Sequence, residues 1–486
     1  MLQGCPQNDI EQVLQDLPES LDETYERMLR TIAPASRGRV IRLLQCLSVA
    51  IRPMRVEELA EILVLDFDGP KGTLPELKDR RRLEDRQRDV LSICSSLVIL
   101  VDNDNSDVIQ FSHFTVKEFL TSDRLFTSKD ISRFHIMREQ AHTTLAQACL
   151  GTLLHFDESS KLKGYASRHW VEHAQFGMVS SRIADGMRRL FDSAQPYFAA
   201  WLQLYDLDER WPHFGDSRIT HRGSPLYYAS LCGFRDLAAH IIAEHPEQVN
   251  GRSGLNHSPL AAALYKRYFD IAKLLHQHGA AVDLYGRNNR TLLFVASVLE
   301  GYVDVVRWLL DHGSDAELGS DDHWTPIIGA AAKGHLETIQ MLLSHGVRVN
   351  ATSEEGYTPL HVASYFCHST IAGLTLQPGA NAGARDTEYC TPSHLASSRG
   401  KSEVVHLLLD NVADIDAKDK RGRTPLDLAI NARRAEVVRQ LLDRGANVNS
   451  QDNDGSTLLH PSYIENVKTN KPSVHHSGIE MFLLTK

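Results

Sequence analysis

Residues 358–364 have the sequence Thr-Pro-Leu-His-Val-Ala-Ser, and residues 391–397, 33 positions later, have the sequence Thr-Pro-Ser-His-Leu-Ala-Ser. Similar starts recur at intervals of 33 or 34 residues, at Ser224, Ser258, Thr291, Thr325, Thr358, Thr391, Thr424 and Thr457. Self-similarity at this period predicts a solenoid, in which each unit buries its apolar face against its neighbours.

Each unit is predicted to contain a hairpin turn, a helix, a tight turn and a second helix. Thr or Ser at the start can cap the first helix, and the Pro that follows fits its first turn. Glycines then stand where helices must end, because Gly adopts a positive φ without strain. Those after first helices are Gly233, Gly334 and Gly400, and those after second helices are Gly279, Gly313, Gly346, Gly379 and Gly445.

These residue types resemble ankyrin repeats, with about eight units and a degenerate last one that runs into a polar stretch at 466–476. The fifth unit has Gly373 inside its second helix and Cys367 in place of the Gly that ends its first. Gly in a helix interior costs about 1 kcal/mol against Ala. We therefore expect the fifth unit to be the softest part of the stack.

The N-terminal half has a different pattern. Helical spacing of apolar residues predicts helices over 39–49 and 53–63, and β-branched runs predict strands over 97–101 and 108–111. A further helix is expected over 113–120. Helices followed by a hairpin indicate a winged-helix domain.

The N-terminal half also resembles a known family. Leu17-Pro18 through Arg27, then residues 111–120, look like the segment that follows the NTPase domain in fungal NACHT–ankyrin (NLR-like) proteins. In that family the segment is a winged helix, also known from GPI inositol-deacylase-like proteins. The resemblance continues into a helical connector, at 140–150, 165–174 and 199–202. It implies the sensing or regulatory C-terminal part of a signalling protein.

One family feature is missing from the sequence. A phosphate-binding loop needs Gly-x-x-x-x-Gly-Lys-Ser/Thr, and no such string occurs here. Residues 69–73 contain the residue types of a phosphate-binding loop but not its spacing. The sequence therefore lacks the NTPase motif, and nucleotide-driven switching is not expected of it.

The expected fold is all-α, with a small β-hairpin in the winged helix. Its expected segments are the end of a helical region (1–32), the winged helix (33–127), the connector (128–221) and the ankyrin repeats (222–486).

Composition limits the function classes. The 486 residues carry a formal net charge of −10, which argues against a general binder of nucleic acid or anionic membranes. The seven cysteines are scattered without a CxxC pair, which favours a reducing compartment. No apolar signal core and no run of about 20 apolar residues occur. We expect a cytoplasmic location, with the nucleus as the alternative.

Catalytic and metal motifs are also missing. The sequence has neither HExxH nor GxSxG, so no catalytic residue, cofactor or metal ligand is predicted. His169 and His173 lie one helical turn apart, but a packed connector helix explains them. Residues 102–107 resemble the start of a calcium loop without its Gly and Glu, so a β-turn is expected. No enzyme activity or small-molecule substrate is expected.

Nucleic-acid binding is not expected either. A winged helix that binds DNA needs basic residues on its wing, whereas residues 102–107 hold three acids and no base. The basic run at 78–88 is interrupted by acids, which favours a solvated insert.

A protein partner on the concave side of the repeats is the predicted ligand. Aromatic and charged residues near the hairpin tips are candidate contacts: Asp321, Asp322, Trp324, Glu354, Glu355, Tyr357, Tyr365, Phe366, Tyr389, Lys420, Arg421 and Arg423. They suggest a partner segment with a basic part. An equally weighted interpretation is that the tips are solvated variation and that Trp324 packs on a neighbouring repeat. The function is thus a non-catalytic scaffold; the alternatives are a free-standing adaptor and, from another class, a hydrolase-related enzyme subunit.

Overall fold

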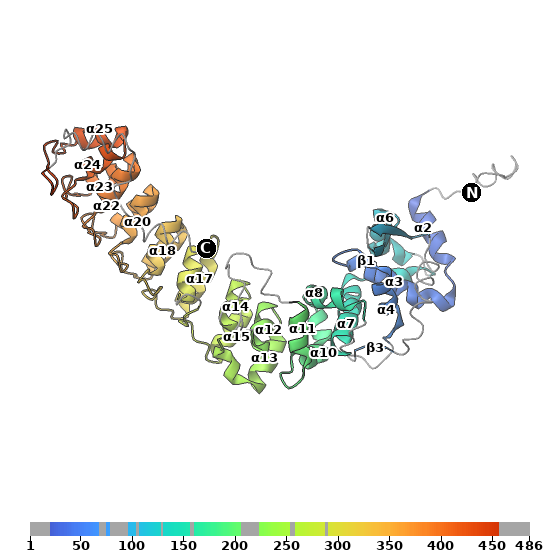
Figure 1. The fold of residues 1–486 in the computed structure, drawn as a ribbon. Helices are drawn as coiled ribbons and strands as arrows, with labels where there is room; N and C mark the ends of the chain where they lie inside the picture. Colours follow the sequence, from blue (N-terminus) through green and yellow to red (C-terminus); the bar gives the residue numbers. More distant parts are fainter. Residues whose placement is uncertain are drawn as a thin grey trace, which may run out of the picture. The chain divides into compact units, whose positions relative to one another are not determined.

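The computed structural model describes residues 20–67, 74–77, 96–103, 106–127, 130–155, 160–205, 223–252, 258–286 and 290–455. They form two compact units. The first contains the N-terminal part up to residue 205 together with residues 228–244, and the second contains residues 223–227 and those from 245 on. Helices dominate both units, with a few short strands in the first (Figure 1).

The first unit begins with helices and a small sheet. Its elements before the connector are α2 (Leu21–Arg30), α3 (Arg37–Val49), β1 (Met54–Arg55), α4 (Val56–Val64), β2 (Leu65–Asp66), β3 (Glu76–Leu77), β4 (Val98–Asn103), β5 (Ser106–Phe111) and α6 (Phe114–Thr121). They confirm the predicted hairpin and helices, except that Met54–Arg55, expected in the helix over 53–63, form strand β1. The basic run at 78–88 and the Gly-rich residues 69–73 lie outside the described residues, as do residues 1–19.

The sheet is antiparallel in the order β1–β5–β4. Met54 pairs with Ile109, and Val98 pairs with Phe111, so the hairpin joins the strand that precedes α4. Helix α6 starts where its N-cap, His113, accepts a hydrogen bond from Thr115 N. The Tyr25 hydroxyl lies 2.6 Å from Thr115 Oγ1, which ties α2 to α6.

The connector consists of further helices: α7 (Arg138–His155), α8 (Lys163–Ala174), α9 (Val179–Arg182), α10 (Ala184–Phe191) and α11 (Tyr197–Leu204). Buried aromatic rings hold them together. Trp170 and Trp201 meet edge to face at 5.3 Å, and Trp170 stacks on Phe234 at 5.5 Å. Phe234 precedes α13 (Arg235–Glu244), so the second helix of the first repeat packs with the connector.

A buried carboxylate joins the connector to the helices before it. Glu61 of α4 accepts hydrogen bonds from Ser160 Oγ at 2.7 Å and from the backbone N–H groups of Lys161 and Leu162 at 2.6 and 2.9 Å. It therefore satisfies backbone donors at the start of α8, which would otherwise be unpaired.

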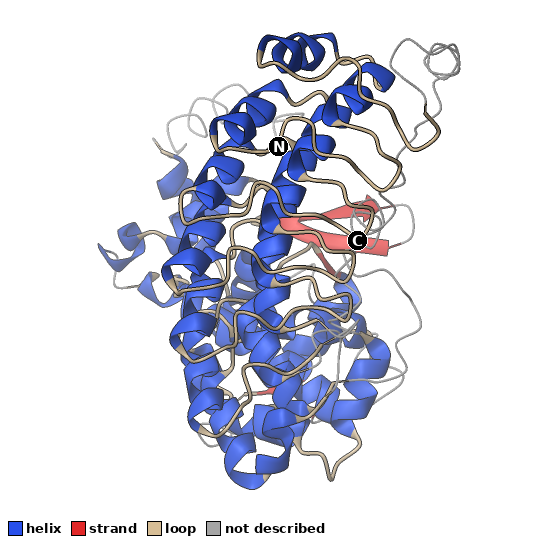
Figure 2. Ribbon diagram, turned by 90° about the vertical axis from the view of Figure 1, so that its left-hand side faces the viewer, coloured by secondary structure: helices blue, strands red, loops and turns tan. Residues whose placement is uncertain are grey.

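The second unit is a stack of helix pairs. After α12 (Pro225–Leu231), the pairs are α14 (Pro259–Tyr265) and α15 (Phe269–Gln277), α16 (Leu292–Val298) and α17 (Val303–Asp311), α18 (Pro326–Lys333) and α19 (Leu336–Ser344), α20 (Pro359–Phe366) and α21 (Ser369–Leu376), α22 (Pro392–Arg399) and α23 (Ser402–Asp410), and α24 (Pro425–Asn431) and α25 (Ala435–Asp443). First helices contact first helices from α16 to α24, and second helices contact second helices from α17 to α25. Figure 2 shows the two layers, with the connecting hairpins on one side. The unit that starts at Thr457 lies outside the described residues.

The tight turns confirm the expected glycines. Gly233, Gly334 and Gly400 have φ of 78°, 80° and 76°. Cys367 takes the same left-handed conformation, with φ 68°, and Arg267 and Arg433 do so at φ 60° and 56°. A residue with a side chain is strained there, by roughly 1–2 kcal/mol.

Replacing Cys367 by Gly should therefore stabilise the fifth repeat by about 0.5–1 kcal/mol, because the strained conformation becomes free of steric cost. Urea unfolding of the two proteins measures the difference. The matched control is Gly400→Ala, which should lower the stability, because the added Cβ would meet Arg434 Cδ at 2.7 Å. Equal stability of Cys367→Gly and the parent protein would contradict the strain.

Candidate interaction surface

The hairpins before α20, α22 and α24 are held by the caps of the helices that follow them. The Thr358 and Thr391 hydroxyls lie 2.9 and 2.8 Å from Nδ1 of His361 and His394, and the same ring nitrogens accept from the backbone N–H of the two threonines. Thr424 has the same arrangement with Asp427. The polar residue three positions into the helix thus completes a capping box.

The histidines also reach the next hairpin. Nε2 of His361 lies 3.1 Å from the Cys390 carbonyl oxygen, and Nε2 of His394 lies 3.0 Å from that of Arg423. Burial lowers the pKa of His394 to about 4, so its ring is neutral at physiological pH. Nδ1 accepts from the threonine N–H, and Nε2 is then the donor to the next repeat.

Consecutive hairpin tips are linked to one another by backbone hydrogen bonds. Each tip donates one N–H to a carbonyl of the tip before it, at 2.8–3.0 Å: Glu354 to Asp322, Thr387 to Glu355, Lys420 to Glu388, and Asn453 to Arg421. The four bonds turn separate loops into one row. Sequence reasoning did not find this row, because backbone pairing between repeats leaves no residue signature.

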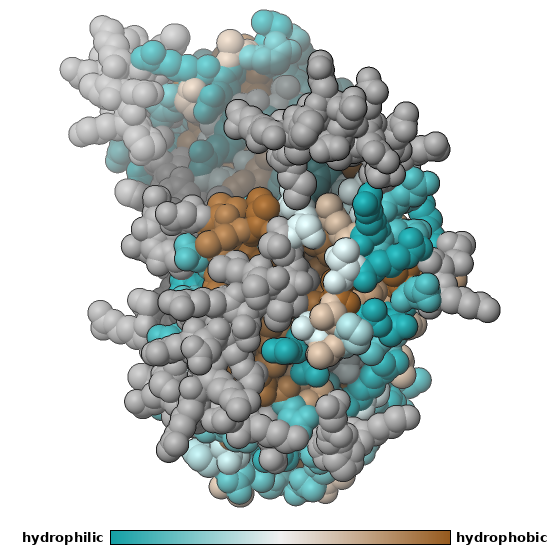
Figure 3. Space-filling view, turned by 90° about the vertical axis from the view of Figure 1, so that its right-hand side faces the viewer, coloured by the Kyte–Doolittle hydropathy of each residue, from teal (hydrophilic) through white to brown (hydrophobic). Residues whose placement is uncertain are grey.

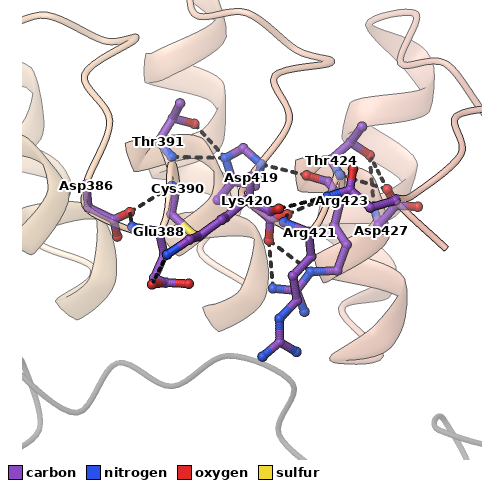
Figure 4. A network of polar contacts seen from close by, with 12 residues as sticks. Asp386, Glu388, Cys390, Thr391, Asp419, Lys420, Arg421, Arg423, Thr424 and Asp427 are labelled. Atoms are coloured by element: carbon purple, nitrogen blue, oxygen red, sulfur yellow. Dashed lines mark hydrogen bonds and ion pairs between the residues drawn. The ribbon is translucent and has the colours of Figure 1, made fainter.

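Most of the charged residues predicted at the tips are exposed. Asp321, Asp322 and Glu354 face solvent, and Glu355 is half-buried. Lys420 and Arg421 are exposed on the tip two repeats further on. Lys420 Nζ lies 3.2 Å from Glu388 Oε1 of the tip between them (Figure 4).

Most of the predicted aromatic contacts are buried instead. Trp324 is 2% exposed, Tyr357 is 5% exposed and Tyr365 is 4% exposed. The idea that these rings are surface anchors is therefore corrected: they pack inside the stack, and the Arg399 guanidinium carbon covers the Tyr365 ring at 3.9 Å. The residue just before a Thr-Pro pair, here Trp324 and Tyr357, therefore has its side chain inside the stack.

The other predicted contacts differ in accessibility. Tyr389 is 52% exposed and has a left-handed φ of 61°, and Phe366 is half-buried. Arg423 is buried on Asp419, with Nε–Oδ2 at 2.9 Å and Nη2–Oδ2 at 2.6 Å. Its guanidinium is part of the hairpin and is not available to a partner.

A carboxyl group equivalent to Asp419 lies one repeat earlier. Asp386 accepts from the N–H groups of Glu388 and Cys390 through Oδ1, at 2.9 and 2.8 Å. Its Oδ2 is buried without a hydrogen-bond partner among the described residues. Burial is the main cause that raises the pKa of Asp386 to about 6, and the charges of Glu388 and Asp419 add to it.

Buried histidines of the connector hydrogen-bond to one another and to tyrosine. His173 lies 2.9 Å from both the Tyr165 hydroxyl and His142 Nδ1, and burial lowers its pKa to about 3. His169 pairs with Glu172 and not with His173.

In the described part of the chain, no group of three or more His, Cys, Asp or Glu side chains could hold a metal ion, and no helix is long and apolar enough to cross a membrane. Figure 3 shows apolar atoms exposed on one face of the molecule.

Comparisons with known proteins agree with this geometry. Models of ankyrin repeats match residues 226–320, 329–372 and 368–452, and a model described as "GPI inositol-deacylase, winged helix domain" matches residues 25–133. The chain contains ankyrin repeats and a winged-helix domain of the GPI inositol-deacylase type. The predicted boundaries between the segments stay a prediction.

Part of the chain is also similar to a curated protein. The chain is 31% identical over 306 residues to "Azaphilone pigments biosynthesis cluster protein L" of Monascus ruber. The match covers 57% of this chain and 63% of that protein. The chain thus spans less than two thirds of the relative's length.

The raised pKa of Asp386 predicts a pH dependence of stability. Its folded pKa of about 6 exceeds the unfolded value of 3.8, so the folded state binds the extra proton and stability falls as pH rises from about 4 to 6. Asp386→Asn removes the buried charge and should stabilise the ankyrin unit at pH 7.5 by about 1–2 kcal/mol after solvent screening is allowed for.

Urea unfolding at pH 7.5 and pH 4 measures this effect. Most of the gain from Asp386→Asn should disappear at pH 4, where the carboxyl is protonated in the folded state and no buried charge remains. A gain of the same size at both pH values would contradict a buried ionised carboxylate.

Proposed function

We propose that the chain is a non-catalytic scaffold that binds a protein partner along the hairpin tips and the adjoining concave side of its ankyrin repeats. The observation that carries the proposal is the hydrogen-bonded row of tips, which presents exposed charges at fixed spacing. A pre-ordered surface loses little conformational entropy on binding, which favours affinity.

The exposed charges along the row are grouped by sign. Asp321, Asp322 and Glu354 form an acidic block, and half-buried Glu355 extends it. A partner segment with Lys or Arg residues facing this block would complement it. Opposite charges across an interface mainly speed association and set the register, and salt weakens them.

The cellular role that fits best is the sensing or regulatory C-terminal part of an NLR-like signalling protein in the cytoplasm. The winged helix followed by a helical connector and ankyrin repeats supports it, since this is the order that the family resemblance implies. A free-standing adaptor with the same binding surface is the second candidate. The relative's name favours it, because that name ties the relative to a pigment biosynthesis cluster and not to a receptor.

An enzyme is the less supported class. The similarity to GPI inositol-deacylase concerns its winged helix, at residues 25–133. This similarity brings no catalytic residue with it.

Neutralising the acidic block tests the binding surface. The variant Asp321→Asn/Asp322→Asn/Glu354→Gln/Glu355→Gln should raise the Kd for a fluorescein-labelled (Gly-Arg)6 peptide by about tenfold or more, measured by fluorescence polarisation at 50 mM salt. The matched control removes four exposed acids from second helices, in Glu337→Gln/Glu403→Gln/Glu436→Gln/Asp443→Asn. Equal losses in the two variants would show only a general charge effect and contradict the proposed surface.

A further inference from the structure

Two neighbouring hairpin tips have the same backbone geometry and differ in one interaction (Figure 4). Asp386 and Asp419 each accept two backbone N–H groups through Oδ1, from the residues two and four positions later. Each also closes its hairpin, with Asp386 N donating to the Cys390 carbonyl at 3.0 Å and Asp419 N donating to that of Arg423 at 2.9 Å. The two carboxyl groups are thus structural equivalents.

The second oxygen of each carboxyl distinguishes them. Asp419 Oδ2 receives two N–H groups from the Arg423 guanidinium. The equivalent of Arg423 in the preceding repeat is Cys390, which is too short and carries no charge. Asp386 is 4% exposed, and its Oδ2 has no partner among the described residues.

The cations near Asp386 are bound elsewhere. Lys420 pairs with Glu388, and the Arg385 guanidinium donates to the Lys418 carbonyl. The groups that interact with Asp386 electrostatically or by hydrogen bonds are acidic or neutral: Tyr357, Glu388, Cys390 and Asp419. An unpaired buried carboxylate in such surroundings is costly, so a cation delivered there would bind favourably.

We infer that the Asp386 tip is a binding site for one arginine side chain of a protein partner, whose guanidinium takes at Asp386 the place that Arg423 takes at Asp419. The inference rests on the proposed function, because it names a contact point for the protein partner. The planar guanidinium matches a carboxylate in a way that ammonium does not. The three residues that follow Asp386 in the tip, Thr387, Glu388 and Tyr389, are exposed to solvent.

A small probe tests the site without any partner protein. N-acetyl-arginine amide is titrated into the ¹⁵N-labelled full chain, and the amide signals of Glu388 and Cys390, which donate to Asp386, are followed by NMR. We expect saturable shifts with a Kd on the order of millimolar. The amides of Arg421 and Arg423, which donate to Asp419, are the internal control and should not move, because that site is already filled.

Two substitutions should abolish the shifts and one should not. Asp386→Asn removes the negative charge, and Cys390→Arg supplies the guanidinium from within the chain, so neither should bind the probe. Cys390→Ser, which changes the side chain without filling the site, should still bind it. The neutral isostere N-acetyl-citrulline amide should give no shift.

Shifts that persist in Asp386→Asn, equal shifts at Arg421 and Arg423, or no shift in the parent chain would each overturn the inference. These outcomes can be told apart from failure of the proposed function. That function is tested by the binding of the (Gly-Arg)6 peptide to variants of other acidic residues. If Cys390→Arg does not fold, Asp386→Asn and Cys390→Ser still decide the question.

Discussion

The stack depends on the capping threonines and the side chains three residues after them. At Thr358 and Thr391 a single buried histidine accepts from the threonine N–H with one ring nitrogen and meets the carbonyl of the next hairpin with the other. The same residue therefore starts a helix and fixes the distance to the next repeat. Loss of one buried hydrogen-bond partner would leave donors or acceptors unsatisfied in both repeats, at roughly 1–3 kcal/mol each.

This interaction explains why loops can be ordered on such a stack. Because the carbonyls of Cys390 and Arg423, just before Thr391 and Thr424, are fixed, the hairpins that lead to them are fixed too. Their tips lie within hydrogen-bond distance of the neighbouring tips. The row of tips is then a rigid base for side chains of either charge. In the proposed scaffold the partner is bound by the tip side chains, whereas stability comes from the caps and the apolar layers beneath them.

The sequence predicted the features that repeat. The 33-residue period, the Thr-Pro starts and the turn glycines gave the helices and their order, and even the strained Cys367 was found as a departure from the pattern. The winged-helix hairpin was predicted from its two runs rich in β-branched residues. Long, regular patterns are reliable because many residues carry the same signal.

Accessibility was predicted less well. Trp324 and Tyr357 precede Thr-Pro and are predicted as surface contacts, yet Cys390 and Arg423 occupy the same position and all four are buried. Aromatic residue type alone does not say which way a side chain points. The unpaired oxygen of Asp386 was also missed, although comparing residues 386–390 with 419–423 shows Cys in place of the Arg that pairs with Asp419.

Residue-resolved amide hydrogen exchange of the free chain tests the central claim, that the hairpin tips form one hydrogen-bonded row. The amides of Glu354, Thr387, Lys420 and Asn453, which donate from tip to tip, should exchange as slowly as amides of the adjoining first helices, because they open with the same cooperative unit. Exchange of these four amides at the rate of an unprotected chain would contradict it.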